Sequence, residues 1–112
     1  MSNIVNKDSV KISNDIVAVI AAIACTEVEG VYGILGSNIK DIIANPKKSS
    51  QKGIKIGINE KNEINLDIML IVKDQYIIPN VCKKVQEIIR EKIEIMVGLS
   101  VKTINIDVID VQ

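Results

Sequence analysis

Hydrophobic and polar residues alternate along several stretches of the chain, which is the pattern of half-buried strands. The alternation covers residues 10–12, 54–58, 64–72 and 101–111. The two middle stretches are separated by a short polar turn, residues 59–62, so they predict a β-hairpin. Their isoleucine faces are expected to make half of the core.

Residues 14–28 predict a first helix, since Ser13 and its polar neighbours can bond the unpaired amides of a helix start. The predicted inward stripe is Ile16, Val19, Ile20 and Ile23. Alanines and valines fill most other positions and leave almost no polar face. The surplus apolar surface must therefore meet a second helix, a further segment or another subunit.

Residues 79–98 predict a second long helix. Pro79 suits its first turn and Gly98 its end. The inward positions are Val81, Val85, Ile88, Ile89 and Met96. Arg90 and Glu94 are expected to face water. A short amphipathic helix at residues 38–44, stopped by Pro46, is expected after the first helix.

These elements predict an α+β fold in the order strand, helix, strand, strand, helix, strand. Right-handed connections favour a two-layer sandwich, with two helices on one face of a mainly antiparallel sheet. A length of 112 residues suits a single domain, residues 1–112. We expect residues 1–8 to form a disordered tail.

The composition excludes several kinds of chemistry. The 14 Lys and Arg balance the 14 Asp and Glu, which argues against a protein whose main task is to coat nucleic acid or an anionic membrane. The chain has no histidine, the commonest general base and metal ligand. Cys25 and Cys82 form no CxxC pair and are expected to be buried in a reducing cytosol. We therefore expect no enzyme activity, cofactor or metal.

The longest apolar run, residues 16–25, is too short to span a membrane, which takes about 20 residues. The first eight residues lack the apolar stretch of a secretory signal. A cytoplasmic location is the expectation that follows.

Tyr32 and Tyr76 are the only aromatic residues. Antiparallel helices would bring both to one edge, beside a loop that carries Lys47 and Lys48. Tyrosine is favoured at contact hot spots, so we predict a partner-binding edge here. Ordinary loop tyrosines are the alternative. The lysine loop is either solvated or in peripheral contact with anionic lipid.

Residues 30–36, GVYGILG, match neither GxGxxG nor a P-loop and predict a loop. Their place between helices keeps a KH-like RNA-binding module as the alternative function, although the loop has no Lys or Arg. An enzyme would need perturbed carboxylates, for which Asp67, Asp107, Glu27 and Glu29 are the candidates. Solvated sheet and cap charges are the favoured explanation of these four.

Several runs of the sequence resemble the bacterial alkaline shock protein family, also called Gls-type general stress or envelope stress response proteins. They are VKIS at residues 10–13, DIVAVIA at 15–21, TEVEGV at 26–31, IPNV at 78–81 and MVGL at 96–99, followed by the last strand. The similarity covers nearly the whole chain. Residues 72–76, VKDQY, depart from the Tyr-Gly pair that is expected there.

The resemblance implies a small cytoplasmic protein without catalytic activity. Some members are held at the membrane by an anchor protein, and others are tied to fatty-acid synthesis through acetyl-CoA carboxylase. It thus implies an interaction or scaffold module in envelope stress or membrane-lipid homeostasis, with protein partners of either kind. The motif residues that it carries over are expected to shape the fold: Glu27, Glu29, Gly30, Pro79, Gly98 and Leu99.

Self-association is a separate expectation. It comes from the nearly all-apolar first helix and from Met69 and Ile71 on an otherwise polar sheet face. A symmetric dimer is the simplest arrangement.

Overall fold

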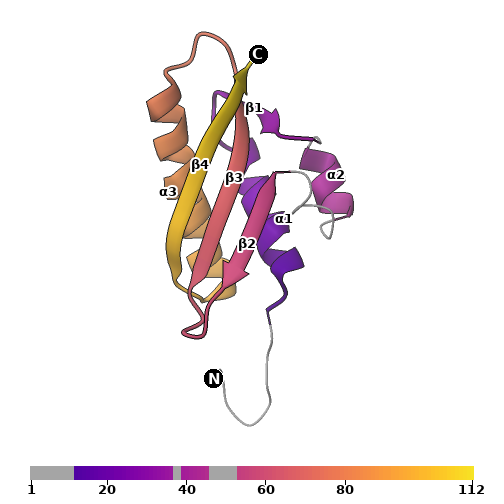
Figure 1. The fold of residues 1–112 in the computed structure, drawn as a ribbon, viewed down its shortest axis with the longest axis vertical. Helices are drawn as coiled ribbons and strands as arrows, with labels where there is room; N and C mark the ends of the chain where they lie inside the picture. The colour runs from indigo at the N-terminus through magenta and orange to yellow at the C-terminus, as the bar shows by residue number, and fades with distance from the viewer. Residues whose placement is uncertain (1–11, 37–38, 46–52) are drawn as a thin grey trace.

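The computed structural model describes residues 12–36, 39–45 and 53–112 (Figure 1). In chain order its elements are α1 (Asn14–Thr26), β1 (Val31–Ile34), α2 (Ile39–Ala44), β2 (Ile54–Ile58), β3 (Ile64–Val72), α3 (Ile78–Val97) and β4 (Val101–Val111). The tail predicted for residues 1–8 lies outside the described residues.

Strand β3 is the centre of the sheet. β4 pairs with it in parallel along its whole length, whereas β2 pairs antiparallel with its first half and β1 antiparallel with its last residues. A strand has two edges, so β1 and β2 must share the edge opposite β4 and lie end to end along it (Figure 1). The sheet is mixed, with two antiparallel pairings and one parallel one.

Helices α1 and α3 lie behind the sheet in the view of Figure 1. The inward side chains of β3 are all buried: Ile64, Leu66, Ile68, Leu70 and Val72. On α3 the buried positions are Val81, Val85, Ile89 and Ile93. The predicted α+β two-layer sandwich, with helices on one face of the sheet, is confirmed.

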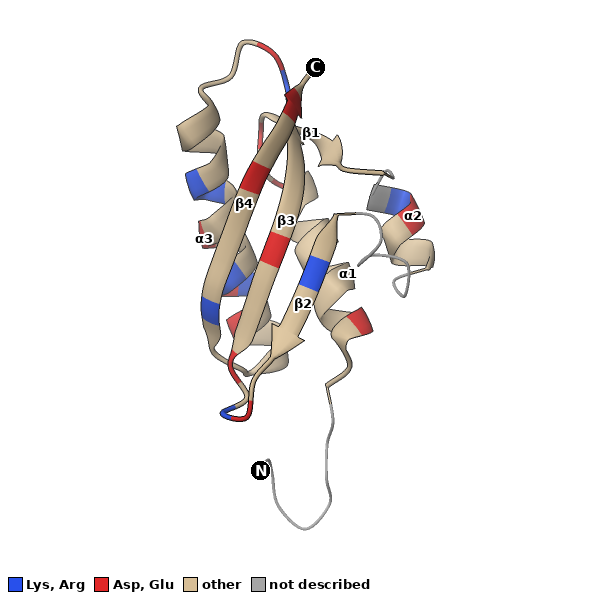
Figure 2. Ribbon diagram, in the orientation of Figure 1, with Lys and Arg blue, Asp and Glu red and all other residues tan. Residues whose placement is uncertain are grey.

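The other face of the sheet is polar (Figure 2). Lys55 on β2 is paired in register with Asp67 on β3, and Asn105 on β4 lies on the other side of Asp67. Asn105 Nδ2 donates a hydrogen bond of 2.8 Å to Asp67 Oδ1, and Thr103 Oγ1 donates one of 2.8 Å to Asn65 Oδ1. This ladder suits a face in contact with water.

The first strand differs from the prediction. Ile12 is not in a strand, and residues 10–11 lie outside the described residues. Instead β1 forms within the glycine-rich segment that predicted a loop. Ile34 pairs with Leu70 and is buried, while a register shift between Val31 and Gly33 marks a bulge. Pairing with the centre of the sheet outweighs the weak strand propensity of the glycines.

The predicted inward stripe of the first helix is largely wrong. Ile20 is buried, but Ile16 and Ile23 are 49% and 41% exposed. The buried face consists of Val17, Ala18, Ile20, Ala21, Ala22, Ala24 and Cys25. Small side chains let a helix approach its neighbours closely. Because this helix has no polar face, its sequence does not indicate which side faces the core. Part of the surplus apolar surface meets α2, whose Ile42 is buried in the core.

Helix α3 and the hairpin match the predictions more closely. Pro79 lies in the first turn of α3, and Gly98 ends the helix with φ +80°. Met96 is exposed rather than inward, and Ile93, which the prediction missed, is buried. The hairpin turn is held by Asn59 Oδ1, which accepts bonds of 2.9 Å from the amides of Lys61 and Glu63.

Candidate functional site

A groove of about 580 Å³ lies between the end of α1 and the start of α3. We call it the α1–α3 groove. Its residues come from the turn after α1, from the loop before α3 and from the first turns of α3, namely Glu27, Val28, Glu29, Gln75, Tyr76, Ile77, Asn80, Val81, Lys84 and Ile88. The end of the first helix therefore lies near the start of the second long helix, as the sequence predicted.

Gly30 brings the two sides of the groove together. Its φ of +98° turns the chain into β1, and its carbonyl oxygen accepts a bond of 2.7 Å from the amide of Lys73. A Cβ atom at this position would lie 2.8 Å from Cδ2 of Tyr76 and 2.7 Å from Cγ2 of Val81. The tyrosine ring thus lies directly against the glycine backbone, where no other residue would leave room for it.

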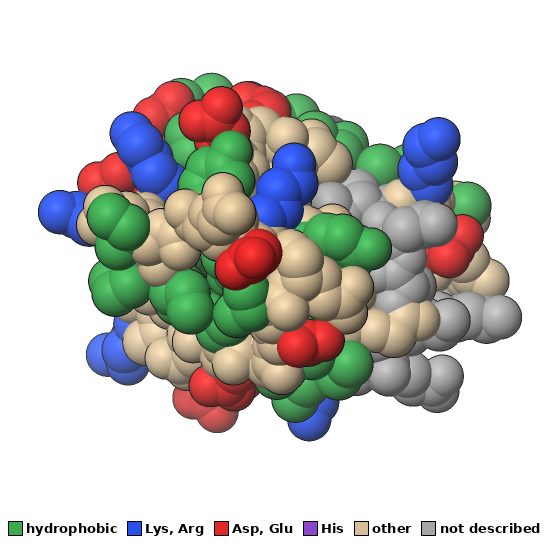
Figure 3. Space-filling model, turned by 90° about the horizontal axis from the view of Figure 1, so that it is seen from above, with side chains coloured by type: hydrophobic (Ala, Val, Ile, Leu, Met, Phe, Trp, Pro, Cys, Tyr) green, Lys and Arg blue, Asp and Glu red, His purple; other side chains and the backbone are tan. Residues whose placement is uncertain are grey.

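The groove combines apolar and charged side chains. Tyr76 and Ile77 are both exposed, and Ile77 has 65% of its surface in contact with water. Glu29 lies on one side and Lys84 on the other, both exposed. The Glu27 carboxylate is bound by Lys92, with 3.0 Å between Oε2 and Nζ. Viewed from the end where β4 terminates, hydrophobic side chains gather among charged ones (Figure 3).

Ile77 occupies the N-cap position of α3, with φ −80° and ψ 109°. Ser, Thr, Asp or Asn normally fills this position because a side-chain oxygen can accept bonds from the first amides of the helix. Isoleucine has no polar atom and cannot do so. The chain thus places an exposed apolar side chain where a polar one would be more stable.

The predicted partner-binding edge is placed only in part. Tyr76 lines the α1–α3 groove, while Tyr32 lies on β1, two residues after Gly30, and is 57% exposed. Lys47 and Lys48 lie outside the described residues. The edge stays a prediction. Gly30 lies against the Tyr76 ring and two residues before Tyr32, so it lies between the two tyrosines.

Among the other motif residues, Gly98 donates its amide to the carbonyl oxygen of Glu94 at 3.2 Å. Leu99 is half-buried against the core. Both lie at the far end of α3 from the α1–α3 groove.

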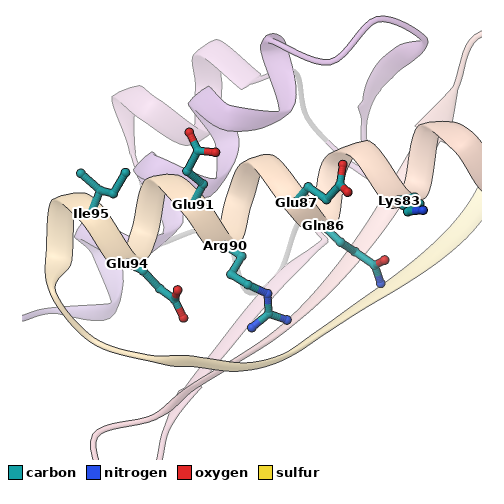
Figure 4. A pocket seen from close by; sticks show the side chains of 7 residues that line it. All are labelled: Lys83, Gln86, Glu87, Arg90, Glu91, Glu94 and Ile95. Carbon is teal, nitrogen blue, oxygen red and sulfur yellow. The ribbon is translucent and has the colours of Figure 1, made fainter.

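A polar stripe that sequence reasoning missed runs along α3. Gln86, Arg90 and Glu94 point towards β4 (Figure 4). Gln86 Nε2 donates to the Ile104 carbonyl oxygen at 2.9 Å, and Glu94 Oε2 accepts from the Val101 amide at 2.9 Å. Arg90 Nη1 donates to the Val101 carbonyl oxygen.

The spacing of four residues is the only sequence signal for this stripe. It was insufficient, because nothing in the sequence places the backbone of β4 beside that flank of the helix. Arg90 and Glu94 were expected only to face water; Glu94 is exposed and Arg90 is half-buried, and both also bond to the last strand.

The four candidate groups for catalysis are divided between two places, with Glu27 and Glu29 in the α1–α3 groove and Asp67 and Asp107 on the sheet. Within the described ranges, no three acidic or cysteine side chains are grouped so that they could hold a metal ion. Asp67 and Asp107 lie on the open sheet face, paired in register with Asn105 and Met69.

Neither thiol is activated. Burial raises the pKa of Cys25 to about 12 and also raises the pKa of Cys82, so both remain protonated near neutral pH.

The RNA-binding alternative needs a loop where residues 31–34 form β1. A GxxG clamp is a loop, so the first of the two GxxG runs, residues 30–33, does not have the backbone that this alternative needs. In the part of the chain that is described, no helix is both long and apolar enough to cross a bilayer.

The fold and its grooves define an α+β two-layer protein whose distinctive features lie on its surface. The chain belongs to the alkaline shock protein 23 family, a family with cell envelope-related function, which matches residues 3–112. The resemblance to the alkaline shock proteins is thereby confirmed. The chain is also similar to the uncharacterized protein YqhY of Bacillus subtilis (strain 168), with 33% identity over 104 residues, 92% of this chain and 76% of the relative. No solved structure matches the chain.

Proposed function

We propose that this protein is a non-enzymatic interaction module, acting as a scaffold in the envelope stress response or in membrane-lipid homeostasis. The envelope-related function of the family supports the general setting. The observation that carries the proposal is Ile77, an exposed isoleucine at a helix N-cap beside Tyr76. Tyr76 and Ile77 together expose apolar surface at the α1–α3 groove, and grouped exposed apolar surface marks interaction sites.

The α1–α3 groove suggests the chemistry of the partner. An apolar side chain of a partner protein would pack against Tyr76 and Ile77. A basic group next to it would meet Glu29, since Lys92 already binds the Glu27 carboxylate. A membrane-anchored protein and a component of acetyl-CoA carboxylase are the two partners we propose. In either case the protein stays in the cytoplasm, and a membrane-anchored partner would also hold it at the membrane.

Ile77→Ser tests this proposal cleanly. Serine supplies the missing N-cap oxygen, so the variant should be more stable than the wild type by about 1 kcal/mol. Its fold is therefore not in question when its binding is measured. Ile95→Ser is the matched control, because Ile95 is 75% exposed on the same helix but at the opposite end.

The measurement is crosslinking in cells that produce the protein, followed by quantification of the crosslinked partners. Ile77→Ser should lose most of the captured partner, and Ile95→Ser should retain it. Adding Tyr32→Ala to Ile77→Ser tests whether the predicted edge extends to β1. Equal capture by Ile77→Ser and the wild type would refute the proposal.

A further inference from the structure

The α1–α3 groove carries one free charge of each sign. Glu29, in the turn after α1, and Lys84, in the first turns of α3, lie on opposite sides of the groove and are exposed. Within the described part of the chain neither side chain forms an ion pair, whereas the Glu27 carboxylate is already bound by Lys92. A ligand that carries one basic and one acidic group can therefore pair with both free charges.

Much of the remaining lining of the groove is apolar. Val28 and Val81 are buried and form its floor, and the exposed Tyr76 and Ile77 come from the loop before α3. The volume of about 580 Å³ lies in the range of about 300 to 1,000 Å³ that is usual for ligand sites. Room of this size accepts a few side chains of a partner, but not the face of a folded domain.

Two side-chain amides add hydrogen-bonding groups to the groove. Gln75 and Asn80 both line it and are exposed, and in the described structure neither side chain has a hydrogen-bond partner. Gln75 uses only its backbone amide, which donates to Asp74 Oδ1 at 3.0 Å. A side-chain amide both donates and accepts hydrogen bonds, and each peptide unit of a backbone offers one donor and one acceptor. The groove is thus suited to a peptide, whereas a lipid acyl chain would leave these amides without partners.

The shape of the groove is fixed by contacts within the chain. The Tyr76 ring packs against Gly30, and the Gly30 carbonyl oxygen accepts a bond of 2.7 Å from the Lys73 amide. The turn after α1 is thereby joined to the loop before α3. A site that is already ordered loses little conformational entropy on binding, so even a short segment with a small contact area can bind.

We propose that the partner inserts a short linear peptide segment into the α1–α3 groove. An apolar residue of the segment packs against Tyr76 and Ile77, a basic residue next to it pairs with Glu29, and an acidic residue pairs with Lys84. This inference rests on the proposed function, because it names the part of the partner that the groove holds. Segments with charges of only one sign are selected against, since they meet a like charge on one side of the groove.

Selection from a displayed library of random short peptides tests the proposal on the full chain. The wild type should enrich peptides that carry an apolar residue with one basic and one acidic neighbour, so that their mean net charge is near zero. Glu29→Lys makes both sides of the groove basic and should shift this mean by about one negative charge or more. Lys84→Glu makes both sides acidic and should shift it equally in the positive direction.

Matched controls lie in the hairpin turn, at the other end of β3 from the groove. Glu60→Lys and Lys61→Glu change the charge of the whole chain as the two groove variants do, and both residues are exposed. They should enrich the same peptides as the wild type. A peptide enriched by the wild type should bind Glu29→Lys and Lys84→Glu about tenfold more weakly in calorimetric titration, and should bind both controls unchanged.

Enriched peptides with the same mean net charge on the wild type and on both groove variants would overturn this proposal. So would the absence of any enriched peptide that binds the wild type but not Ile77→Ser. In either case Ile77→Ser could still lose its captured partner in cells, and the partner would then bind through a folded surface. Equal capture by Ile77→Ser and the wild type refutes the proposed function instead, so the two failures are distinguishable.

Discussion

At the scale of single residues, Gly30 and Gly98 both have positive φ, but their surroundings differ. Gly30 lies under the Tyr76 ring, whereas an added Cβ at Gly98 would meet nothing within 4 Å. Both substitutions to alanine force an unfavourable backbone conformation, which costs about 1 to 2 kcal/mol. Only Gly30→Ala also drives a methyl group into packed side chains.

We therefore predict that Gly30→Ala lowers the free energy of unfolding by about 3 kcal/mol or more, and Gly98→Ala by about 1 kcal/mol. Urea denaturation of both variants measures the difference. Gly30→Ala should also move the Tyr76 ring, which the tyrosine fluorescence would report. Equal losses for the two variants would mean that the ring contact contributes nothing.

The buried Cys25 thiol predicts how the free energy of unfolding depends on pH. Burial raises the pKa of its thiol from 9.0 to about 12, so the folded chain holds this proton at pH values where the unfolded chain has lost it. The contribution of this pKa difference to the free energy of unfolding is fully present below pH 9. It is lost as the pH rises from 9 towards 12. The slope is about 1.4 kcal/mol per pH unit.

Cys25→Ala removes the thiol and isolates its effect from other groups that titrate in this range. We expect the variant to be about 1 kcal/mol less stable at pH 8, because of the small cavity. This deficit should shrink and then reverse between pH 9 and 10.5, as measured by urea denaturation under reducing conditions. A constant difference over that range would show that the buried thiol does not couple to folding.

At the scale of elements, α3 is held to β4 by side chains that bond to backbone groups. Arg90→Met retains the apolar stem and the helix propensity but removes the bond to the Val101 carbonyl oxygen. We predict a loss of about 1.5 kcal/mol in the free energy of unfolding and faster hydrogen exchange at the start of β4.

Lys92→Met is the matched control for Arg90→Met on the same helix. It removes an ion pair with Glu27 in which both side chains are partly exposed, and such pairs contribute less than about 1 kcal/mol. If Lys92→Met proved as damaging as Arg90→Met, the bonds to the β4 backbone would have no special role.

The elements differ in how far their sequences determine them. The hairpin β2–β3 and helix α3 were predictable, because each has one polar and one apolar face and a clear turn or end signal. Helix α1 has no polar face, so its orientation is decided by where its alanines fit. Strand β1 exists because Ile34 and Val31 pair with the end of β3, which no local pattern of residues 30–36 reveals.

The candidate site was predictable to the same limited degree. Tyr76 and the approach of the two helix ends followed from topology, whereas the stripe on α3 required the position of β4. Ile77 is informative only after the start of α3 is fixed, since an isoleucine is unremarkable until it is found at an N-cap.

At the scale of the whole molecule, the two faces of the sheet have different roles. The helices bury one face, and the ladder of polar side chains keeps the other face in water. Stacking of two such faces is thereby disfavoured, because it would remove these polar groups from water. The α1–α3 groove lies on the helix side, so a partner bound there would leave the polar face of the sheet in water.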